Sequence, residues 1–168
     1  MREGDTPFIG ATAFNNGVTM RVGNEGRRFP GNVLTVCYNG SIGETFYQTE
    51  PFLASDDVNV LRPKFRMDCH IALFLATLIR LEGANFAYTD KWQKKVMEKS
   101  ILHLPCKGQA PDWNYMAQFI KNLSANLIAQ DYKDDSFKDS ENMNENLDND
   151  APEEPQVLPE AADENWKQ

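Results

Sequence analysis

The chain has 168 residues, which is room for one domain of ordinary size. With 41% hydrophobic, 25% charged and 11% aromatic residues, its composition excludes collagen-like, mucin-like and wholly disordered chains. The formal net charge of −8 is unevenly spread: residues 131–168 carry thirteen acids against three lysines, whereas residues 1–130 carry 14 lysines and arginines against 12 acids. The acidic balance therefore says little about what the first 130 residues bind.

The cysteines and the N-terminus indicate the compartment. Cys37, Cys69 and Cys106 are odd in number and far apart, with no CxxC pair, so the sequence predicts neither a disulfide framework nor a metal site. No run of about 18 apolar residues occurs, and residues 1–5 lack the apolar stretch of a secretory signal. We therefore expect a cytoplasmic protein in a reducing compartment, with no membrane partner.

The first half of the chain is predicted to be mostly β structure. Its segments are β-branched, aromatic or alternating, and turn residues separate them. Asn39-Gly40 favours a hairpin turn at positive φ, and Asn16-Gly17 favours another turn. The expected strands are 9–13, 18–22, 33–38, 44–48 and 57–61.

Beyond Phe65 the apolar residues recur at helical spacing. Pro111 and Asp112 suit the first turn of a helix. The expected elements are a helix over 71–83 that packs on the sheet, a lysine-rich helix capped by Thr89 and Asp90, a short strand at 101–104, and a third helix from residue 110 with the apolar stripe Met116, Phe119, Ile120, Leu123 and Leu127.

Residues 131–168 are rich in Asp, Glu, Asn and Pro and have few large apolar side chains. They cannot bury enough surface to offset roughly 1–2 kcal/mol of backbone entropy per residue, so we expect a disordered acidic tail. Such a tail either solubilises the protein or competes with a polyanion for a basic surface. The expected fold class is α+β: a small, twisted, mostly antiparallel sheet in the N-terminal half, packed by C-terminal helices and followed by this tail.

The sequence contains no recognisable catalytic machinery. It has no GxSxG elbow, Walker loop, HExxH motif, kinase set or methyltransferase cofactor loop, so we expect no catalytic residue and no cofactor. Asp56 and Asp57 are adjacent and would point to opposite faces of an extended chain, which makes them poor ligands for one metal ion. His70 and His103 are interpreted as structural residues.

Basic and carboxamide side chains indicate nucleic-acid binding instead. Lys91, Lys95 and Lys99 lie at i, i+4 and i+8 and would share one helix face, where they could bind phosphates. Trp92 and Val96 would occupy the neighbouring face and point inward. A solvated surface also explains such a face, and Asn-Gly steps also serve turns. The phosphate candidates are Arg62, Lys91, Lys94 and Lys95, the base-edge candidates are Asn15, Asn16, Thr19, Asn39 and Ser41, and Arg21, Arg27, Arg28, Lys64 and Arg66 add positive charge.

Several motifs between about residues 6 and 123 follow one another in a characteristic order. They are Pro7-Phe8-Ile9-Gly10-Ala11-Thr12-Ala13, Asn15-Asn16-Gly17-Val18, Asn39-Gly40-Ser41-Ile42-Gly43, Phe52-Leu53-Ala54-Ser55-Asp56-Asp57, the helix from Ile71, Lys91-Trp92, Leu104-Pro105 and Pro111-Asp112-Trp113. Together they resemble the target-recognition domain of Type I restriction-modification specificity subunits, in the variety found in Type IIG and IIB-like enzymes.

The resemblance implies a compact α/β module that reads bases in duplex DNA, while separate methyltransferase and endonuclease subunits carry out catalysis. Residues 1–130 would form this domain. Family members usually have a further strand and loop before the stretch that matches Pro7-Phe8-Ile9, and a second recognition domain with a heptad helix. We therefore expect a truncated reading frame, a half-subunit that dimerises, or a fragment that a partner completes.

A different class of function is a protein-interaction module. The domain could dock on a methyltransferase without binding DNA, while its acidic tail mimics DNA in a restriction complex as a decoy. Deletion of residues 131–168 distinguishes the two hypotheses. A decoy would lose its effect, whereas a DNA reader would bind as well or better.

Overall fold

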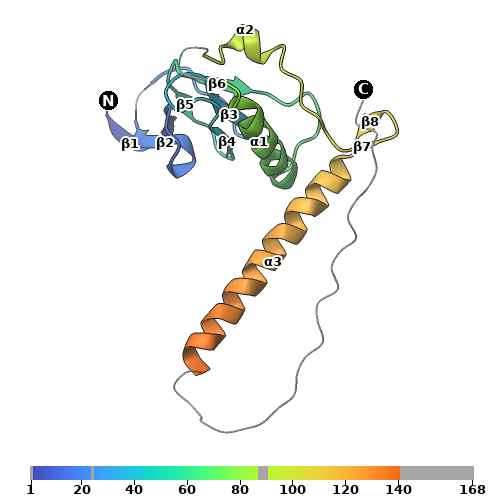
Figure 1. Cartoon of the computed structure of the whole chain (residues 1–168). Coiled ribbons are helices and arrows are strands. Elements are labelled where there is room, and N and C mark those ends of the chain that lie inside the picture. The colour runs from blue at the N-terminus through green and yellow to red at the C-terminus, as the bar shows by residue number, and fades with distance from the viewer. Residues whose placement is uncertain (1, 24, 87–90, 141–168) are drawn as a thin grey trace, which may run out of the picture. The chain divides into compact units, whose positions relative to one another are not determined.

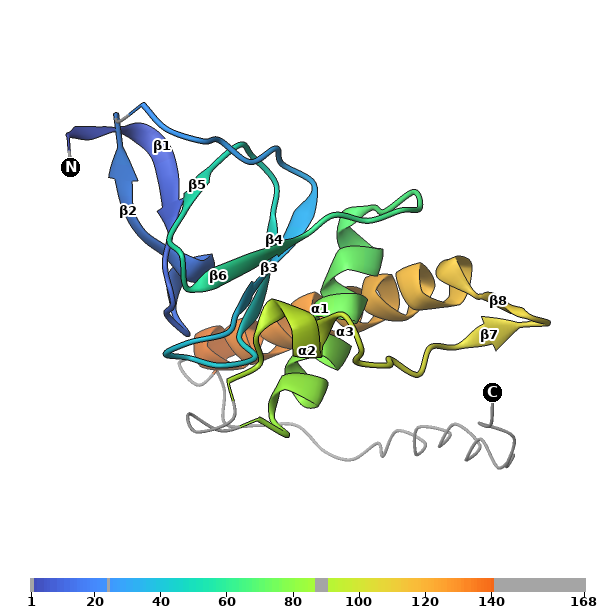
Figure 2. The same cartoon turned by 90° about the horizontal axis from the view of Figure 1, so that it is seen from above.

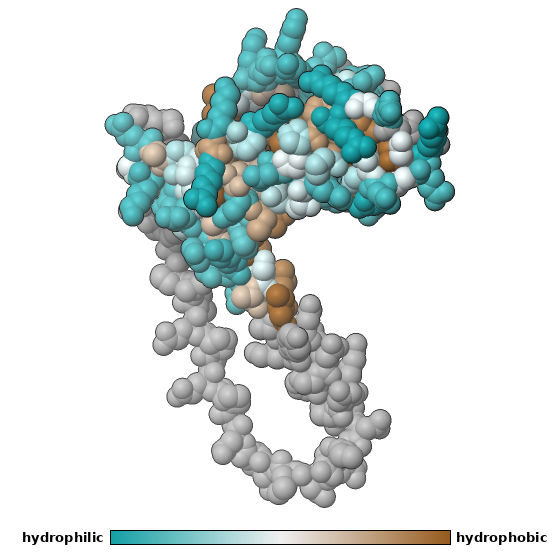
Figure 3. Space-filling model, turned by 180° about the vertical axis from the view of Figure 1, so that it is seen from behind, coloured by the Kyte–Doolittle hydropathy of each residue, from teal (hydrophilic) through white to brown (hydrophobic). Residues whose placement is uncertain are grey.

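The computed structural model describes residues 2–23, 25–86 and 91–140, and side chains as far as residue 128. The chain forms two compact units, Met1–Leu123 and Ser124–Gln168. In the first unit, two small sheets precede the helices, so the fold class is α+β, as predicted (Figure 1). Polar side chains cover most of the face seen in Figure 3, and hydrophobic ones emerge in small groups.

The first sheet has three strands in the order β2-β1-β5. β1 (Glu3–Ile9) pairs antiparallel with β2 (Val18–Val22) and parallel with β5 (Leu53–Ala54). The bounds of β2 match the prediction, but the strand expected over 9–13 is wrong. The reason is that the ladder to β2 ends at Ile9, after which the Gly10 N–H donates across the loop to the Gly17 carbonyl (2.9 Å).

The second sheet is antiparallel, with the order β4-β3-β6. Its strands are β3 (Val33–Cys37), β4 (Thr45–Gln48) and β6 (Val58–Leu61), and β3 is buried along its whole length. The predicted hairpin between β3 and β4 is confirmed. Gly40 and Gly43 lie at φ +77° and +83°, where glycine has no steric cost. Figure 2 shows the two sheets side by side, with α1 next to the second.

Helix α1 (Cys69–Gly83) packs on β3 and β4 and closes the larger core. It ends where predicted but begins at Cys69, two residues before the predicted range, because the Asp68 carboxylate caps it by accepting a hydrogen bond from the Ile71 N–H (2.9 Å). At its end, a Cβ on Gly83 would lie 2.4 Å from the Gly43 Cα, so only glycine permits this close approach to the hairpin. The buried face of the helix consists of Ile71, Ala72, Leu75, Ala76 and Ile79.

Helix α2 (Lys94–Met97) is much shorter than the expected lysine-rich helix. Trp92 is buried as predicted, but it precedes the helix, stacking on Phe86 (5.2 Å between ring centroids) and donating to the Ser100 Oγ (3.0 Å). The inward orientation expected for Val96 is wrong, since this side chain is 42% exposed. Short helices depend on tertiary packing, and here the packing residue lies outside the helix.

The strand expected at 101–104 is absent from the described residues, because alternating apolar residues need a neighbouring strand edge to pair with. Ile101 is exposed instead. A small hairpin follows, formed by β7 (Cys106–Lys107) and β8 (Ala110–Pro111). Gly108 lies in its turn at φ +68°.

Helix α3 (Trp113–Ser140) follows this hairpin, and the Asp112 carboxylate caps it by accepting from the Tyr115 N–H (2.9 Å). Pro111 belongs to β8 and not to the helix, contrary to expectation. Trp113 stacks on Phe65 at 4.1 Å, which joins the helix to the core. The predicted apolar stripe divides: Met116 and Ile120 are buried, whereas Phe119, Leu123 and Leu127 are about half exposed.

Two predictions concern segments at the limits of the described residues. Thr89 and Asp90, the expected helix cap, lie outside the described residues. Residues 141–168, the larger part of the expected disordered tail, also lie outside them. The remaining part of that tail, 131–140, is helical in the structure because α3 continues to Ser140. Each residue added to an existing helix needs no new nucleation. No helix among the described residues is long and apolar enough to cross a membrane.

Candidate nucleic-acid interface

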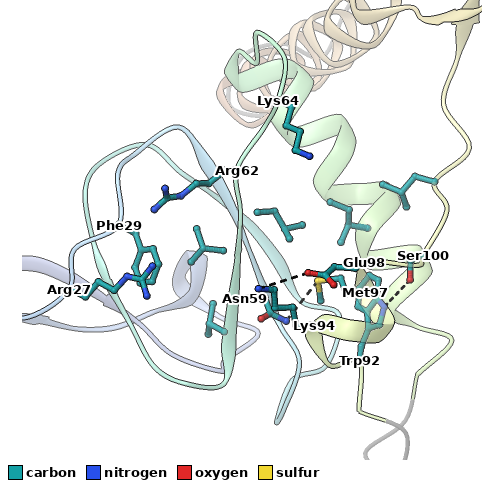
Figure 4. Close-up of a pocket in the computed structure, with 15 residues that line it drawn as sticks. Arg27, Phe29, Asn59, Arg62, Lys64, Trp92, Lys94, Met97, Glu98 and Ser100 are labelled. Atoms are coloured by element: carbon teal, nitrogen blue, oxygen red, sulfur yellow. Dashed lines mark hydrogen bonds and ion pairs between the residues drawn. The ribbon is translucent and has the colours of Figure 1, made fainter.

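A groove of about 650 Å³ lies between β6 and α2 (Figure 4). Its polar lining is mostly cationic and comes from separate parts of the chain: Arg27 between β2 and β3, Arg62 and Lys64 after β6, and Lys94 at the start of α2. Glu98 is the carboxylate among the lining residues. The apolar lining consists of Phe29, Val58, Val60, Leu61, Ile79, Trp92, Met97 and Leu102.

The cations of the groove are largely free to bind an external anion. Lys94 Nζ lies 3.9 Å from a Glu98 carboxylate oxygen, but both side chains are mostly exposed, so the pair contributes little stability. The Arg27 guanidinium lies over the Phe29 ring at 5.2 Å. Within the described part of the chain, Arg62 and Lys64 make no ion pair. The groove therefore combines an apolar floor with an excess of positive charge.

The structure brings two of the four phosphate candidates together. Arg62 and Lys94, far apart in the sequence, both line the groove. Lys91 precedes α2 and is half-buried, and Lys95 is exposed on α2, so neither is a lining residue. The shared helical face expected for Lys91, Lys95 and Lys99 does not form, because α2 spans only Lys94–Met97.

The two loops that carry the base-edge candidates also meet. A Cβ on Gly40 would lie 3.2 Å from the Ala11 Cβ, so the β3–β4 turn packs on the loop between β1 and β2. Gly17, at the end of the loop between β1 and β2 (the first loop), packs against the Phe46 ring on β4. The candidates thus belong to one continuous part of the surface.

The first loop uses its carboxamides internally. Asn15 and Asn16 adopt positive φ of 51° and 52°. The Asn15 Nδ2 donates to the Val18 carbonyl (2.9 Å) and the Asn16 Nδ2 to the Tyr47 carbonyl (3.1 Å). The Asn16 carbonyl in turn accepts from the buried Gln48 side chain (3.0 Å). These bonds are turn chemistry, and both side chains remain exposed.

The other base-edge candidates differ in their accessibility. The Asn39 Nδ2 donates to the Asp57 carboxylate (2.7 Å), and the Asn39 Oδ1 is buried. Thr19 is exposed and donates from its hydroxyl to the Phe8 carbonyl (3.1 Å). Ser41 is half-buried in the hairpin turn. Base contact by these residues stays a prediction.

Three residues that line or support this surface were not selected from the sequence as site residues. Lys64 and Arg27 were noted only as added positive charge, although both line the groove. Gln48 was taken as part of a strand, but it is 4% exposed and holds the first loop. A buried glutamine in a β strand is the signal that could have identified it, because buried polar groups need partners.

The described residues contain no group of three or more potential metal ligands. Cys37 is buried, and desolvation, with smaller effects from Glu44 and Asp57, raises the pKa of its thiol to about 11. The thiol is therefore protonated at neutral pH and is no nucleophile. Cys69 and Cys106 are exposed.

Comparison with known proteins places the chain in a family. The model of the Type I restriction modification DNA specificity domain matches residues 2–130. The specificity subunit S.BcgI of the Type II restriction enzyme BgcI of Heyndrickxia coagulans is 36% identical over 132 residues, which are 77% of this chain and 39% of that protein. The Type I restriction enzyme MpnII specificity subunit of Mycoplasma pneumoniae is 31% identical over 106 residues, 61% of this chain and 31% of that protein.

Solved structures share the fold. A chain of a type I R-M system, studied for its complex assembly and conformational transition, matches with a TM-score of 0.58 at 16% identity, covering 82% of this chain and 35% of that chain. The S subunit of a Type-I restriction-modification system from M. genitalium matches with a TM-score of 0.50 at 17% identity, covering 80% of this chain and 35% of that chain. The present chain thus spans well under half the length of these relatives. Since the family model covers most of its sequence, the protein belongs to the family of the Type I restriction modification DNA specificity domain.

Proposed function

We propose that this chain directs a restriction-modification enzyme to its DNA sequence. Residues 1–130 form the recognition domain, and residues 131–168 are an acidic segment outside it. Duplex DNA is the ligand, separate methyltransferase and endonuclease subunits carry out catalysis, and the chain itself needs no cofactor. Membership of the specificity-domain family and the absence of recognisable catalytic motifs from the sequence support this assignment.

The groove between β6 and α2 is the observation that carries the proposal. Phosphates of one DNA strand would bind Arg62 and Lys94, with Arg27 and Lys64 beside them. The deoxyribose rings would contact the apolar floor. Each phosphate that a cation neutralises releases condensed counterions, so the affinity must fall steeply with salt. Two lysines outside the groove, the half-buried Lys91 and the exposed Lys95, would bind flanking phosphates.

Base edges would be read by the two adjoining loops. Asn15, Asn16, Thr19 and Ser41 need only small movements to contact a base, because part of each side chain is accessible. Asn39 would have to turn its carboxamide away from Asp57. Replacement of a base-reading residue changes which site is preferred, whereas loss of a turn residue weakens binding to every sequence.

The salt dependence of binding to random-sequence duplex DNA tests the phosphate assignment. In the full chain, the pair Arg62→Ala and Lys94→Ala should make the fall of log K with log salt less steep, reducing the magnitude of the slope by about 2. The pair Lys91→Ala and Lys95→Ala should do the same. Lys107→Ala with Lys121→Ala is the matched control, since both lysines lie on other elements, and it should leave the slope unchanged. An unchanged slope in the groove variant would refute the phosphate site.

Helix α3 is the surface that we propose for a partner chain. Tyr115, Phe119 and Leu123 recur every four residues and are 47–52% exposed, which is costly for a helix that stays in water. We propose that a second copy of the chain covers this stripe. Light scattering of the purified chain should report a homodimer that Leu123→Lys dissociates. A monomer that associates only with the methyltransferase would assign the stripe to that subunit instead.

A further inference from the structure

Phe14 is the most exposed large apolar side chain among the described residues. Its side chain is 79% exposed, compared with 73% for Ile101 and 64% for Leu81. It lies in the loop between β1 and β2, directly before Asn15 and Asn16. Burial of a phenylalanine side chain away from water is favourable, and this loop does not obtain that stabilisation.

The loop holds the phenylalanine in this position through several hydrogen bonds. The Phe14 N–H donates to the Thr12 Oγ1 (3.2 Å), and the Phe14 carbonyl accepts from the Gly17 N–H (2.9 Å). The Asn16 side chain joins the same loop to Tyr47 on β4. These bonds restrain the backbone on both sides of the ring. Its exposure is a property of an ordered loop and not of a frayed end.

The neighbouring polar groups leave the ring as the contact that the loop offers most freely. The Asn15 and Asn16 amides and the Thr19 hydroxyl already donate to backbone carbonyls within the protein. The β3–β4 turn packs beside this loop through Gly40 and Ala11, so the ring belongs to the surface proposed for base contact. An apolar side chain and polar side chains that contact bases would thus lie on the same surface.

We propose that Phe14 is a specificity-determining residue that contacts the C5-methyl group of a thymine in the recognised DNA site. This inference rests on the proposed function. In the major groove of B-form DNA the base edges present hydrogen-bonding groups, except for the thymine methyl, which is apolar. An exposed phenyl ring on an ordered loop therefore has one complementary partner there.

The experiment uses the full chain and the duplex that it enriches from a random pool. Each thymine of the enriched site is replaced by deoxyuridine, one at a time, and binding is measured by fluorescence anisotropy. At one position the wild type should lose about fourfold in affinity, which corresponds to one methyl group removed from an apolar contact. Phe14→Ala should bind thymine and uracil equally at that position. Ile101→Ala, which removes a comparably exposed apolar side chain elsewhere, should behave like the wild type.

Several outcomes would overturn the inference. They are an enriched site without thymine, no position at which uracil weakens binding, or an unchanged thymine preference in Phe14→Ala. A rise in 2-aminopurine fluorescence that needs Phe14 would assign the ring to wedging between base pairs, which also contradicts a methyl contact. Failure of the wild type to enrich any sequence would refute DNA reading itself. An enriched site that is indifferent to Phe14 overturns this inference alone.

Discussion

Gln48 holds the loop between β1 and β2 to the second sheet, and its replacement by leucine tests that role. The side chain is 4% exposed. Its Nε2 donates to the Asn16 carbonyl and to the Thr35 Oγ1, both at 3.0 Å, and its Oε1 lies 3.5 Å from the Asn16 Nδ2. Leucine has a similar volume, so Gln48→Leu removes the hydrogen bonds without opening a large cavity.

The expected loss follows from the two short bonds. Each hydrogen bond contributes a net of about 1 kcal/mol to stability, and a buried group left unpaired costs more. Thr35 keeps a partner because its hydroxyl also donates to the Phe46 carbonyl (3.3 Å), and water can reach the exposed Asn16. We therefore expect Gln48→Leu to lower the free energy of unfolding by about 2 kcal/mol.

Urea denaturation measures this loss. With an m value of about 1–3 kcal/mol/M, the midpoint should fall by about 1 M at unchanged m. A double-mutant cycle with Thr35→Val should show a coupling of about 1 kcal/mol, because the two side chains share a bond. DNA binding should keep its salt dependence but lose sequence preference as the loop is released. A change in stability below about 0.5 kcal/mol would refute the reasoning, since leucine packing would then replace everything that the hydrogen bonds contribute.

Two further predictions concern a thiol and a helix cap. The folded-state pKa of Cys37, about 11, exceeds its ordinary value of 9.0, so the resulting stabilisation is complete below pH 9 and is lost as the pH rises towards 11. Between pH 8 and 11 the free energy of unfolding should fall more steeply for the wild type than for Cys37→Ala, and the difference should reach about 2–3 kcal/mol. Parallel curves of the free energy of unfolding against pH would contradict this. Asp112→Ala should lower stability by about 1 kcal/mol in urea denaturation because it removes the α3 cap, whereas Asp112→Asn, which can still accept the bond, should not; equal losses would show that the charge matters and not the cap.

Elements with strong local signals were predictable from the sequence. The hairpin of β3 and β4 follows from β-branched segments joined by Asn39-Gly40, and α1 follows from its apolar period and its end near Gly83. Turn chemistry at Asn15 and Asn16 was likewise expected as the simpler interpretation. These features depend on interactions within a few residues, which a sequence displays directly.

Pairings between distant segments could not be predicted in the same way. The shift of β1 to Glu3–Ile9 and the two-residue β5 depend on which strand edges meet, and Val96 is exposed because Trp92 is buried outside α2. The same holds for the site. The sequence identified Arg62 and Lys94 as cations, but only the packing of α2 beside β6 made them walls of one groove.

By itself, the sequence determined the class of this protein: an α+β domain with basic and carboxamide side chains and motifs in the order found in specificity domains. Tertiary structure decided which of those side chains are available. It turned the Asn39 carboxamide towards Asp57, joined two loops through Gly40 and Ala11, and left the Phe14 ring in water. The physical reason is that residue type and spacing fix local conformation, whereas accessibility and hydrogen-bond partners depend on contacts between residues that are far apart in the chain.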